Sequence, residues 1–286
     1  MTVRYPSATG RRPNLRGAIS RRFNVYSQHD VANRNGKWIW RFHPAGAENV
    51  RIVIFPHAGG SASYYHSLSA KLSKSADVLA VQYPGRQNRS AEPCVQSVPE
   101  LARRIAAELR SLAAGPMALF GHSMGAAIAF EVARLLSAHD RGPCHLFVSS
   151  RSAPTRPRRD RNLHLGTDQE ILDEVSRVSG TDPELLRDES LRGLILPALR
   201  ADYRAIETYR YLPGARLSCP ITALTGDTDP TVEVRDVLGW QDETDAGFVT
   251  RVFPGGHFYL DHHLPSVAGT LLSALGVGER EGSRPC

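Results

Sequence analysis

The stretch that decides the fold is Met117-Ala-Leu-Phe-Gly-His-Ser-Met-Gly-Ala126, a short apolar run leading into Gly121-His-Ser-Met-Gly125. Its first four residues have the length and character of a buried strand, and Ala126–Leu136 has the pattern of a helix. The turn between them must be sharp, so its central serine is strained and its glycines avoid collisions with neighbouring backbone. This G-x-S-x-G pattern predicts a nucleophile, Ser123, at the N-terminus of a helix.

Strands and helices alternate on both sides of this turn. Helical spacing of apolar residues occurs at 62–74, after Pro99 and at about 265–275. Short apolar runs predict five further strands, at Arg51–Phe55, Val78–Val81, His145–Ser149, Ile221–Thr225 and Phe248–Phe253. Alternation of this kind predicts an α/β protein whose mostly parallel central sheet carries helices on both faces. With the G-x-S-x-G turn between a strand and a helix, it favours the α/β-hydrolase fold.

The alternation stops between about 155 and 215, where no strand is predicted. Three helical patterns occur there instead, at about 168–178, 182–190 and 191–203. We expect a helical lid inserted over the carboxyl ends of the strands. The expected organisation is therefore one α/β-hydrolase domain, residues 37–286, that contains this lid.

The first 36 residues differ in composition from the rest of the chain. They contain seven arginines and a single acidic residue, Asp30, and show no apolar periodicity. We therefore expect residues 1–36 to be a basic, disordered extension. An organelle transit peptide has a similar composition, but a dispensable tail is the simpler interpretation.

Composition also limits the kinds of site and compartment. The cysteines Cys94, Cys144, Cys219 and Cys286 are scattered, without a CxxC pair or a histidine cluster at metal-binding spacing. The sequence thus predicts neither a disulfide framework nor a metal site, and no cofactor is implied. No apolar run is long enough to span a membrane. We expect a cytoplasmic protein that binds neither nucleic acid nor membrane.

A serine nucleophile needs a base and an acid, which follow it in the order acid, then histidine, in this fold. His257 is the expected base because it follows the last strand in a loop of proline and glycines, whereas His262 and His263 look like solvated residues. The acid should end the preceding strand, where Asp227 and Asp229 are both candidates. Asp229 is favoured because the loop needs a residue or two to turn, which leaves Asp227 as a turn-former.

The oxyanion that develops during the reaction must be stabilised by hydrogen bonds from backbone N–H groups. One donor is expected from Met124, the residue after the nucleophile. The other is expected from the loop after the first core strand, from either Ala58 or Gly59. His57 in that loop is interpreted as a residue that shapes it by hydrogen bonding rather than as a catalytic group.

With these residues in view, the chain resembles the type II thioesterases, the discrete editing enzymes of polyketide and nonribosomal peptide assembly lines. The resemblance covers about Trp38 to Leu275. It is carried by Phe55-Pro-His-Ala-Gly-Gly-Ser-Ala62, Val81-Gln-Tyr-Pro-Gly-Arg86, Phe120-Gly-His-Ser-Met-Gly-Ala126, Leu199-Arg-Ala-Asp-Tyr203, Gly226-Asp-Thr-Asp-Pro230 and Phe253-Pro-Gly-Gly-His-Phe-Tyr259.

The resemblance implies hydrolysis of acyl groups from the phosphopantetheine arm of an acyl or peptidyl carrier protein. We expect the protein itself to be a monomer. The family's triad falls on Ser123, Asp229 and His257, and its oxyanion donors fall on Ala58 and Met124. The predicted insertion corresponds to the family's mobile lid. The N-terminal extension has no counterpart in the family, so the resemblance says nothing of its role.

Other interpretations remain open. A carboxylesterase or lipase would use the same triad. A terminal cyclising thioesterase domain is another possibility, although such a domain is normally fused to a synthetase. A catalytically silent binding module would keep the fold without the activity. The segment Arg151–Arg161 contains five arginines and is either a docking patch for an acidic carrier protein or a solvated loop.

Overall fold

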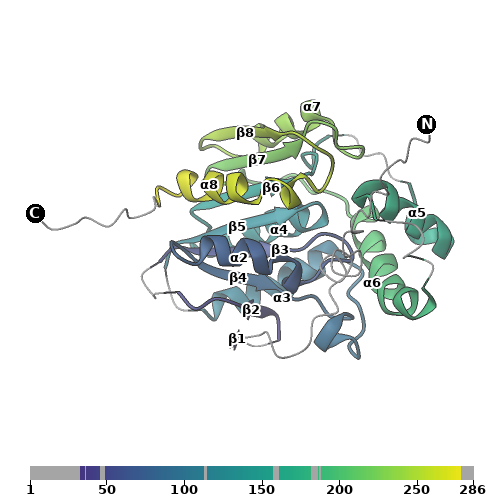
Figure 1. Ribbon diagram of the computed structural model, residues 1–286. Coiled ribbons are helices and arrows are strands. Elements are labelled where there is room, and N and C mark those ends of the chain that lie inside the picture. The colour runs from purple at the N-terminus through teal and green to yellow at the C-terminus, as the bar shows by residue number, and fades with distance from the viewer. Residues whose placement is uncertain are drawn as a thin grey trace, which may run out of the picture.

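The computed structural model describes residues 33–35, 37–45, 49–112, 115–156, 161–181, 186 and 188–277. Within them, eight strands form one sheet in the order β1-β2-β4-β3-β5-β6-β7-β8 (Figure 1). The strands are β1 (Asn33–Asn35), β2 (Ile39–Arg41), β3 (Arg51–Phe55), β4 (Asp77–Val81), β5 (Met117–His122), β6 (His145–Ser149), β7 (Ile221–Gly226) and β8 (Phe248–Phe253). All six predicted strands are present, and they pair in parallel.

Two antiparallel strands at one edge of the sheet were not predicted. β2 pairs with β4, and β1 pairs with β2. Each has only three residues, which is too short for a period-2 pattern to stand out from the sequence. β1 lies in the segment for which we expected disorder, whereas residues 1–32 of that segment lie outside the described part of the chain.

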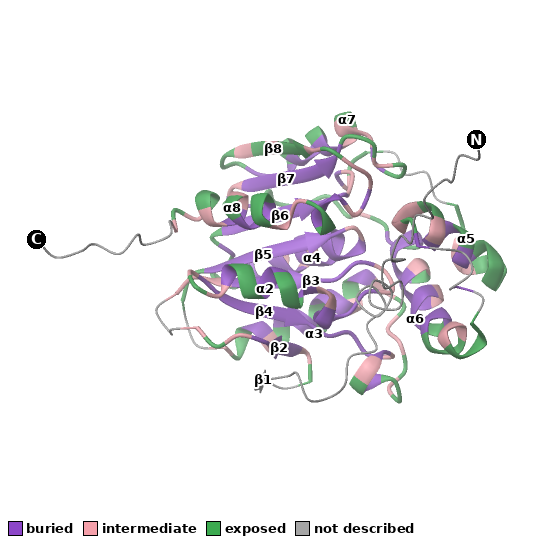
Figure 2. Cartoon of the chain, viewed as in Figure 1, coloured by how far each residue is buried: buried purple, intermediate pink, exposed green. Residues whose placement is uncertain are grey.

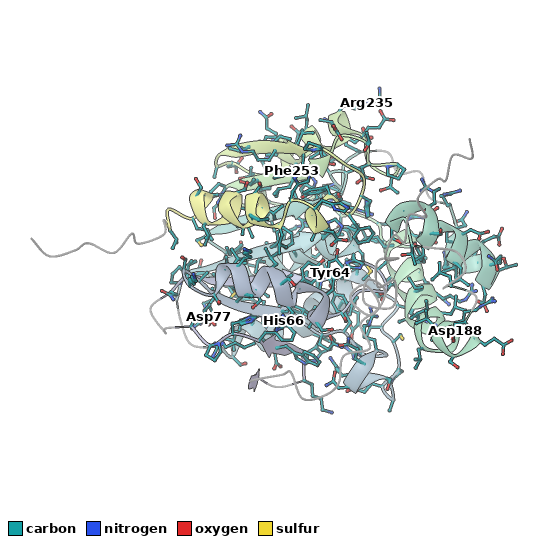
Figure 3. All side chains as sticks on the ribbon, viewed as in Figure 1. Tyr64, His66, Asp77, Asp188, Arg235 and Phe253 are labelled. Carbon is teal, nitrogen blue, oxygen red and sulfur yellow. The ribbon has the colours of Figure 1, made fainter. Side chains whose placement is uncertain are left out.

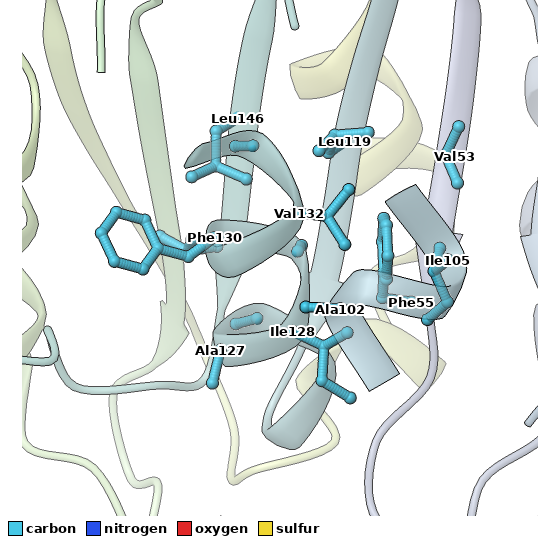
Figure 4. Packing of buried hydrophobic residues seen from close by; sticks show 14 of the residues in the cluster. Val53, Phe55, Ala102, Ile105, Leu119, Ala127, Ile128, Phe130, Val132 and Leu146 are labelled. Atoms are coloured by element: carbon cyan, nitrogen blue, oxygen red, sulfur yellow. The ribbon is translucent and has the colours of Figure 1, made fainter. Parts of the chain in front are cut away.

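Alternate residues of the central strands enter two separate cores. Val53 and Leu119 face α3 (Val98–Arg110) and α4 (Met124–Ser137), whose packing is shown in Figure 4. Ile52 and Phe120 face the opposite side, which is covered by α2 (His66–Leu72) and α8 (Leu264–Ala274). The central strands are therefore buried on both faces (Figure 2), as a parallel sheet requires. The predicted layer order is confirmed.

Two long helices stand between β6 and β7 and lie side by side beyond one end of the sheet (Figure 1). α5 (Asp168–Ser179) begins with a capping box of Thr167 and Glu170. α6 (Glu189–Glu207) is capped by the preceding residue Asp188, labelled in Figure 3, whose carboxylate accepts a hydrogen bond from the Leu191 N–H.

The first predicted pattern of the insertion corresponds to α5, and the third belongs to α6. The second lies partly outside the described residues, and its last two residues, 189–190, begin α6. The described part of the insertion contains no strand. The remaining short elements are η2 (Ala62–Tyr65), η3 (Gln87–Arg89), η4 (Leu163–Leu165), α7 (Val234–Val237), η6 (Leu238–Glu243) and η7 (Tyr259–Asp261). No helix in the described ranges is long and apolar enough to cross a membrane.

The turn from β5 to α4 leaves no room for side chains at its two glycines. A Cβ on Gly121 would overlap the backbone of Gly125 and Ala126, and one on Gly125 would overlap the carbonyl groups of Phe55 and Pro56. Backbone cannot move aside as a flexible side chain can, so these contacts require glycine.

Gly125→Ala should therefore lower the free energy of unfolding by about 3 kcal/mol or more, or prevent folding, when measured by urea denaturation. Gly193→Ala is the matched control, because a Cβ there meets nothing within 4 Å inside α6. It should raise the free energy of unfolding by up to about 1 kcal/mol, since alanine favours helix over glycine. Equal effects of the two substitutions would contradict the packing account of the turn.

His145, at the start of β6, is a buried titratable group inside the sheet. Its ring stacks on Phe147 at a centroid distance of 4.2 Å, and its Nε2 lies 2.8 Å from Thr222 Oγ1. Burial lowers the pKa of His145 to about 4, because the charged imidazolium is poorly solvated there. In the unfolded chain the pKa returns to about 6.5.

Between these two values the unfolded chain binds the proton and the folded chain does not, so stability should fall as the pH is lowered from about 6.5 to about 4. The loss from His145 alone should reach up to about 3 kcal/mol. His145→Gln should flatten this part of the profile of unfolding free energy against pH. Substitution of the exposed His139 is the control and should leave the slope unchanged.

Candidate functional site

A cavity of about 560 Å³ lies at the carboxyl ends of the parallel strands. Its floor is formed by the loops that follow β3, β5, β6, β7 and β8, and its cover by α5 and α6. Among the residues that line it are Ala58, Ser123, Met124, Asp229 and His257. The structure thus brings all the predicted site residues to a single cavity.

Ser123 occupies the strained position predicted for the nucleophile. Its φ and ψ are 56° and −119°, a combination that side-chain-bearing residues rarely adopt. Its N–H donates to the Ser149 carbonyl oxygen at 2.8 Å, which ties the turn to the neighbouring strand β6. Ser123 is also the N-cap residue of α4, so the helix dipole favours negative charge beside it.

His257 and Asp229 form a direct pair. His257 Nδ1 lies 2.8 Å from Asp229 Oδ2, and both side chains are buried, with exposed fractions of 6% and 0%. Thr231 was not predicted, yet it joins the pair: its N–H and its hydroxyl both donate to Asp229 Oδ1, and its Oγ1 is 2.9 Å from His257 Nδ1. The spacing Asp-Pro-Thr could have indicated this contact, because aspartate side chains commonly accept from the N–H two residues later.

These hydrogen bonds keep Asp229 ionised. Burial alone would raise the pKa of its carboxyl group, but the hydrogen bond and charge of His257 and the two bonds from Thr231 outweigh burial. The pKa of Asp229 is therefore below its ordinary value. A charged carboxylate in this position fixes the His257 tautomer with the proton on Nδ1 and leaves Nε2 as a proton acceptor.

The alternative residues have other contacts. Asp227 does not bond its own turn as predicted; its Oδ1 accepts from the N–H of Gly255, in the loop that leads to His257. Asp227 therefore connects the loop after β7 to the loop after β8 instead of stabilising its own turn. His263 Nε2 bonds the Pro254 carbonyl, and His262 is exposed. Neither histidine lines the cavity.

The loop after β3 distinguishes the two candidate oxyanion donors. The Gly59 N–H already donates to Asp202 Oδ2 at 2.7 Å. Ala58 lines the cavity, as does Met124, the first residue of α4. Because a helix leaves its first N–H groups without intrahelical partners, Met124 offers a donor, and Ala58 is the better candidate in the loop. His57 packs against Tyr64 and Phe258, and its Nδ1 is 3.3 Å from Tyr65 Oη, as expected for a residue that shapes the loop.

A buried polar network behind the nucleophile was not predicted. His122 Nδ1 lies 2.9 Å from Ser149 Oγ, which in turn is 2.7 Å from Tyr259 Oη. Burial lowers the pKa of His122 far below its ordinary value, and the nearby rings of His257 and His57 lower it further. A neutral His122 can lie close to His257 without opposing its protonation. No sequence pattern indicated this network, because its residues come from three separate segments.

Two arginines of the basic segment lie beside carboxylate groups, and one of these, Glu174, is shared with Arg177. Arg161 pairs with Glu174 of α5, and Arg156 lies 3.7 Å from Asp242. Arg151 lines the cavity, and Arg158 and Arg159 lie outside the described residues. Over the described chain, Cys94, Cys144 and Cys219 are free, and no three His, Cys, Asp or Glu side chains are grouped to hold a metal ion.

The comparisons with known proteins agree on one family. The thioesterase domain family model matches residues 50–275. A probable cadicidin biosynthesis thioesterase of Streptomyces griseus is 46% identical over 94% of this chain and 73% of its own length. Thioesterase PikA5 of Streptomyces venezuelae is 49% identical over 85% of this chain and 87% of its own.

Solved structures give the same result. The type II thioesterase BorB from the borrelidin biosynthetic cluster superposes with a TM-score of 0.79 at 45% identity, covering 83% of this chain and 97% of its own. YbtT, a type II thioesterase of the yersiniabactin pathway, has a TM-score of 0.76 at 30% identity, covering 84% and 98% of the two chains. These matches confirm the predicted α/β-hydrolase fold. The protein therefore belongs to the thioesterase family, among the type II thioesterases of polyketide and nonribosomal peptide biosynthesis.

Proposed function

We propose that this thioesterase removes acyl groups from the phosphopantetheine arm of an acyl or peptidyl carrier protein, with Ser123, His257 and Asp229 as its catalytic triad. The observation that carries the proposal is the buried His257–Asp229 pair, which lines the same cavity as the strained Ser123. The names of its relatives, which place them in cadicidin and yersiniabactin biosynthesis, support a carrier-bound substrate.

The chemistry follows from the positions of these groups. Ser123 Oγ attacks the thioester carbonyl carbon while His257 Nε2 takes the hydroxyl proton. The carbonyl oxygen becomes an oxyanion, which the N–H groups of Met124 and Ala58 stabilise. The C–S bond then breaks, the departing sulfur receives the proton from His257, and an acyl-serine remains.

Water completes the cycle. His257 Nε2 takes a proton from a water molecule as its oxygen attacks the acyl carbon, and then returns the proton to Ser123 Oγ as the free acid leaves. Asp229 stabilises the imidazolium in both halves and is not itself protonated, in keeping with its lowered pKa. All three groups come from one chain, so a monomer should be active.

The insertion fits the role of a lid. Apolar side chains of α5 and α6 that line the cavity, among them Val175, Leu199 and Ile206, face the loops that carry Ser123 and His257. A cover of this kind excludes water from the first half-reaction and contacts the acyl chain. The acyl preference is then expected to depend on these side chains.

The first test compares carrier-bound and free substrates. With propionyl groups on a carrier protein, on free pantetheine and as a matched oxygen ester, kcat/KM should be highest on the carrier and lowest on the oxygen ester. Ser123→Ala should lose at least about 10³-fold in kcat on every substrate while remaining folded. Preference for the oxygen ester would instead support a carboxylesterase, and no preference for the carrier would contradict the proposed partner.

The second test separates the two aspartates. Asp229→Asn should reduce kcat by about 10⁴-fold, as loss of the acid does in other triads, because the amide cannot fix the required His257 tautomer. Asp227→Asn is the matched control on the same loop. It keeps an oxygen that can accept from the Gly255 N–H, so its loss should be about tenfold or less. If the Asp227 variant lost more activity than the Asp229 variant, the assignment of the acid would be reversed.

A further inference from the structure

Two of the segments that carry the family resemblance supply no member of the proposed triad or oxyanion hole: Val81–Arg86 and Leu199–Tyr203. The structure brings them into direct contact. Arg86 donates two parallel hydrogen bonds to the Asp202 carboxylate, from Nη1 to Oδ2 at 2.7 Å and from Nη2 to Oδ1 at 2.8 Å. Their side chains are 6% and 1% exposed, so the pair is almost completely removed from water. A buried ion pair requires close compensation of both charges, which the bidentate geometry provides.

The ion pair also binds the loop that follows β3. Asp202 Oδ2 accepts the Gly59 N–H at 2.7 Å, and Arg86 Nη1 donates to the Gly60 carbonyl oxygen at 3.0 Å. Both bonds are to residues that directly follow Ala58, the proposed oxyanion donor. The position of the Ala58 peptide in the cavity therefore depends on the bonds made immediately after it in the chain.

Packing reinforces this contact. Gly59 has a φ of +72°, and a Cβ there would come within 2.5 Å of Leu199 Cδ2 on α6. Gly60 has no room either, because its Cβ would touch the His57 ring. Helix α6 therefore rests directly on the loop, and Asp202 is the point at which the helix bonds the loop backbone.

The electrostatic balance of the pair matters for the reaction. Burial alone would lower the pKa of Arg86, but the charge and hydrogen bonds of Asp202 outweigh burial, so the pKa lies above its ordinary value. Arg86 stays charged and neutralises the carboxylate. An unneutralised carboxylate bonded to Gly59 would oppose negative charge developing on the substrate beside Ala58.

We propose that Asp202, with Arg86, is a positioning residue for the oxyanion hole: it holds the Gly59 N–H so that the Ala58 N–H faces the cavity. Because Asp202 belongs to α6, the covering helix must be seated on the loop for the oxyanion hole to be complete. Closure of the cavity and assembly of the hole are then one event. This inference rests on the proposed function, in which Ala58 supplies an oxyanion donor.

The test replaces each member of the pair and a matched arginine. Asp202→Asn keeps the shape and one acceptor oxygen but removes the charge, and Arg86→Gln removes the partner. Arg89→Gln is the control, because Arg89, in η3 directly after that segment, is about as buried as Arg86 but pairs with Glu92 and makes no bond to residues 57–60. Circular dichroism and thermal unfolding establish which variants are folded at the assay temperature.

Both Asp202→Asn and Arg86→Gln should lower kcat for a small acyl thioester by about 10- to 100-fold while changing KM less than about threefold. The rate of Ser123 modification by a fluorophosphonate, whose oxygen occupies the same hole, should fall in parallel. Arg89→Gln should keep kcat within about threefold of the wild type even where it lowers the unfolding temperature. A structural role alone would not separate the two arginines in this way.

Folded Asp202→Asn protein with kcat within threefold of the wild type would overturn the proposal, and so would an equal loss in Arg89→Gln. If Asp202→Asn does not fold, Arg86→Lys is assayed instead: it keeps the charge but cannot make the paired bonds, and it should show the same split between kcat and KM. The fluorophosphonate rates also separate the two hypotheses. If the wild type reacted with the fluorophosphonate but did not hydrolyse carrier-bound acyl groups, the proposed substrate would be contradicted. The positioning role could still be measured from the fluorophosphonate rates of the variants.

Discussion

The backbone constraint at the turn between β5 and α4 is the feature on which the rest of the structure depends. Ser123 holds its strained conformation because its N–H is hydrogen-bonded to β6. Gly121 and Gly125 are also required, because a Cβ atom on either would overlap neighbouring backbone. The two cores on either side of the sheet supply the stability that such strain requires. Around this fixed serine, the loops after the other parallel strands can each bring one group to the same edge, since all those strands end there.

The parts of the fold that could be predicted were those whose signal is local. Strands buried on both faces are continuous apolar runs, so Arg51–Phe55 and His145–Ser149 were predicted with their observed bounds. The edge strands β1 and β2 were missed because three residues carry too little pattern. In the insertion, the helix expected at about 191–203 begins two residues earlier and continues to Glu207, because neither Gly193 nor Pro197 ends it.

In the site, chain order and loop composition led to Ser123, Asp229, His257 and Met124, and the family resemblance led to Ala58. The structure brings all five to one cavity. The partners of these residues were not predictable. Arg86 and Asp202 are 116 residues apart in the chain, and only the packing of α6 on the loop after β3 brings them together. The Gly59 N–H, open as a donor in the sequence, is excluded by that same contact.

The parallel register has a consequence for how such an enzyme can change in length. On the neighbouring strands β3, β5 and β6, the register places Phe55, Gly121 and Val148 directly beside one another. Along each strand, successive side chains point to opposite faces of the sheet. A residue inserted into or deleted from β5 would exchange the sides on which Leu119 and Phe120 lie and turn the nucleophile away from its base. We therefore expect changes in length to be tolerated best in loops at the opposite edge of the sheet, such as 138–144, and in the insertion. Of these, only the insertion lines the cavity, so variation in substrate can accumulate there while the length of β5 stays constant.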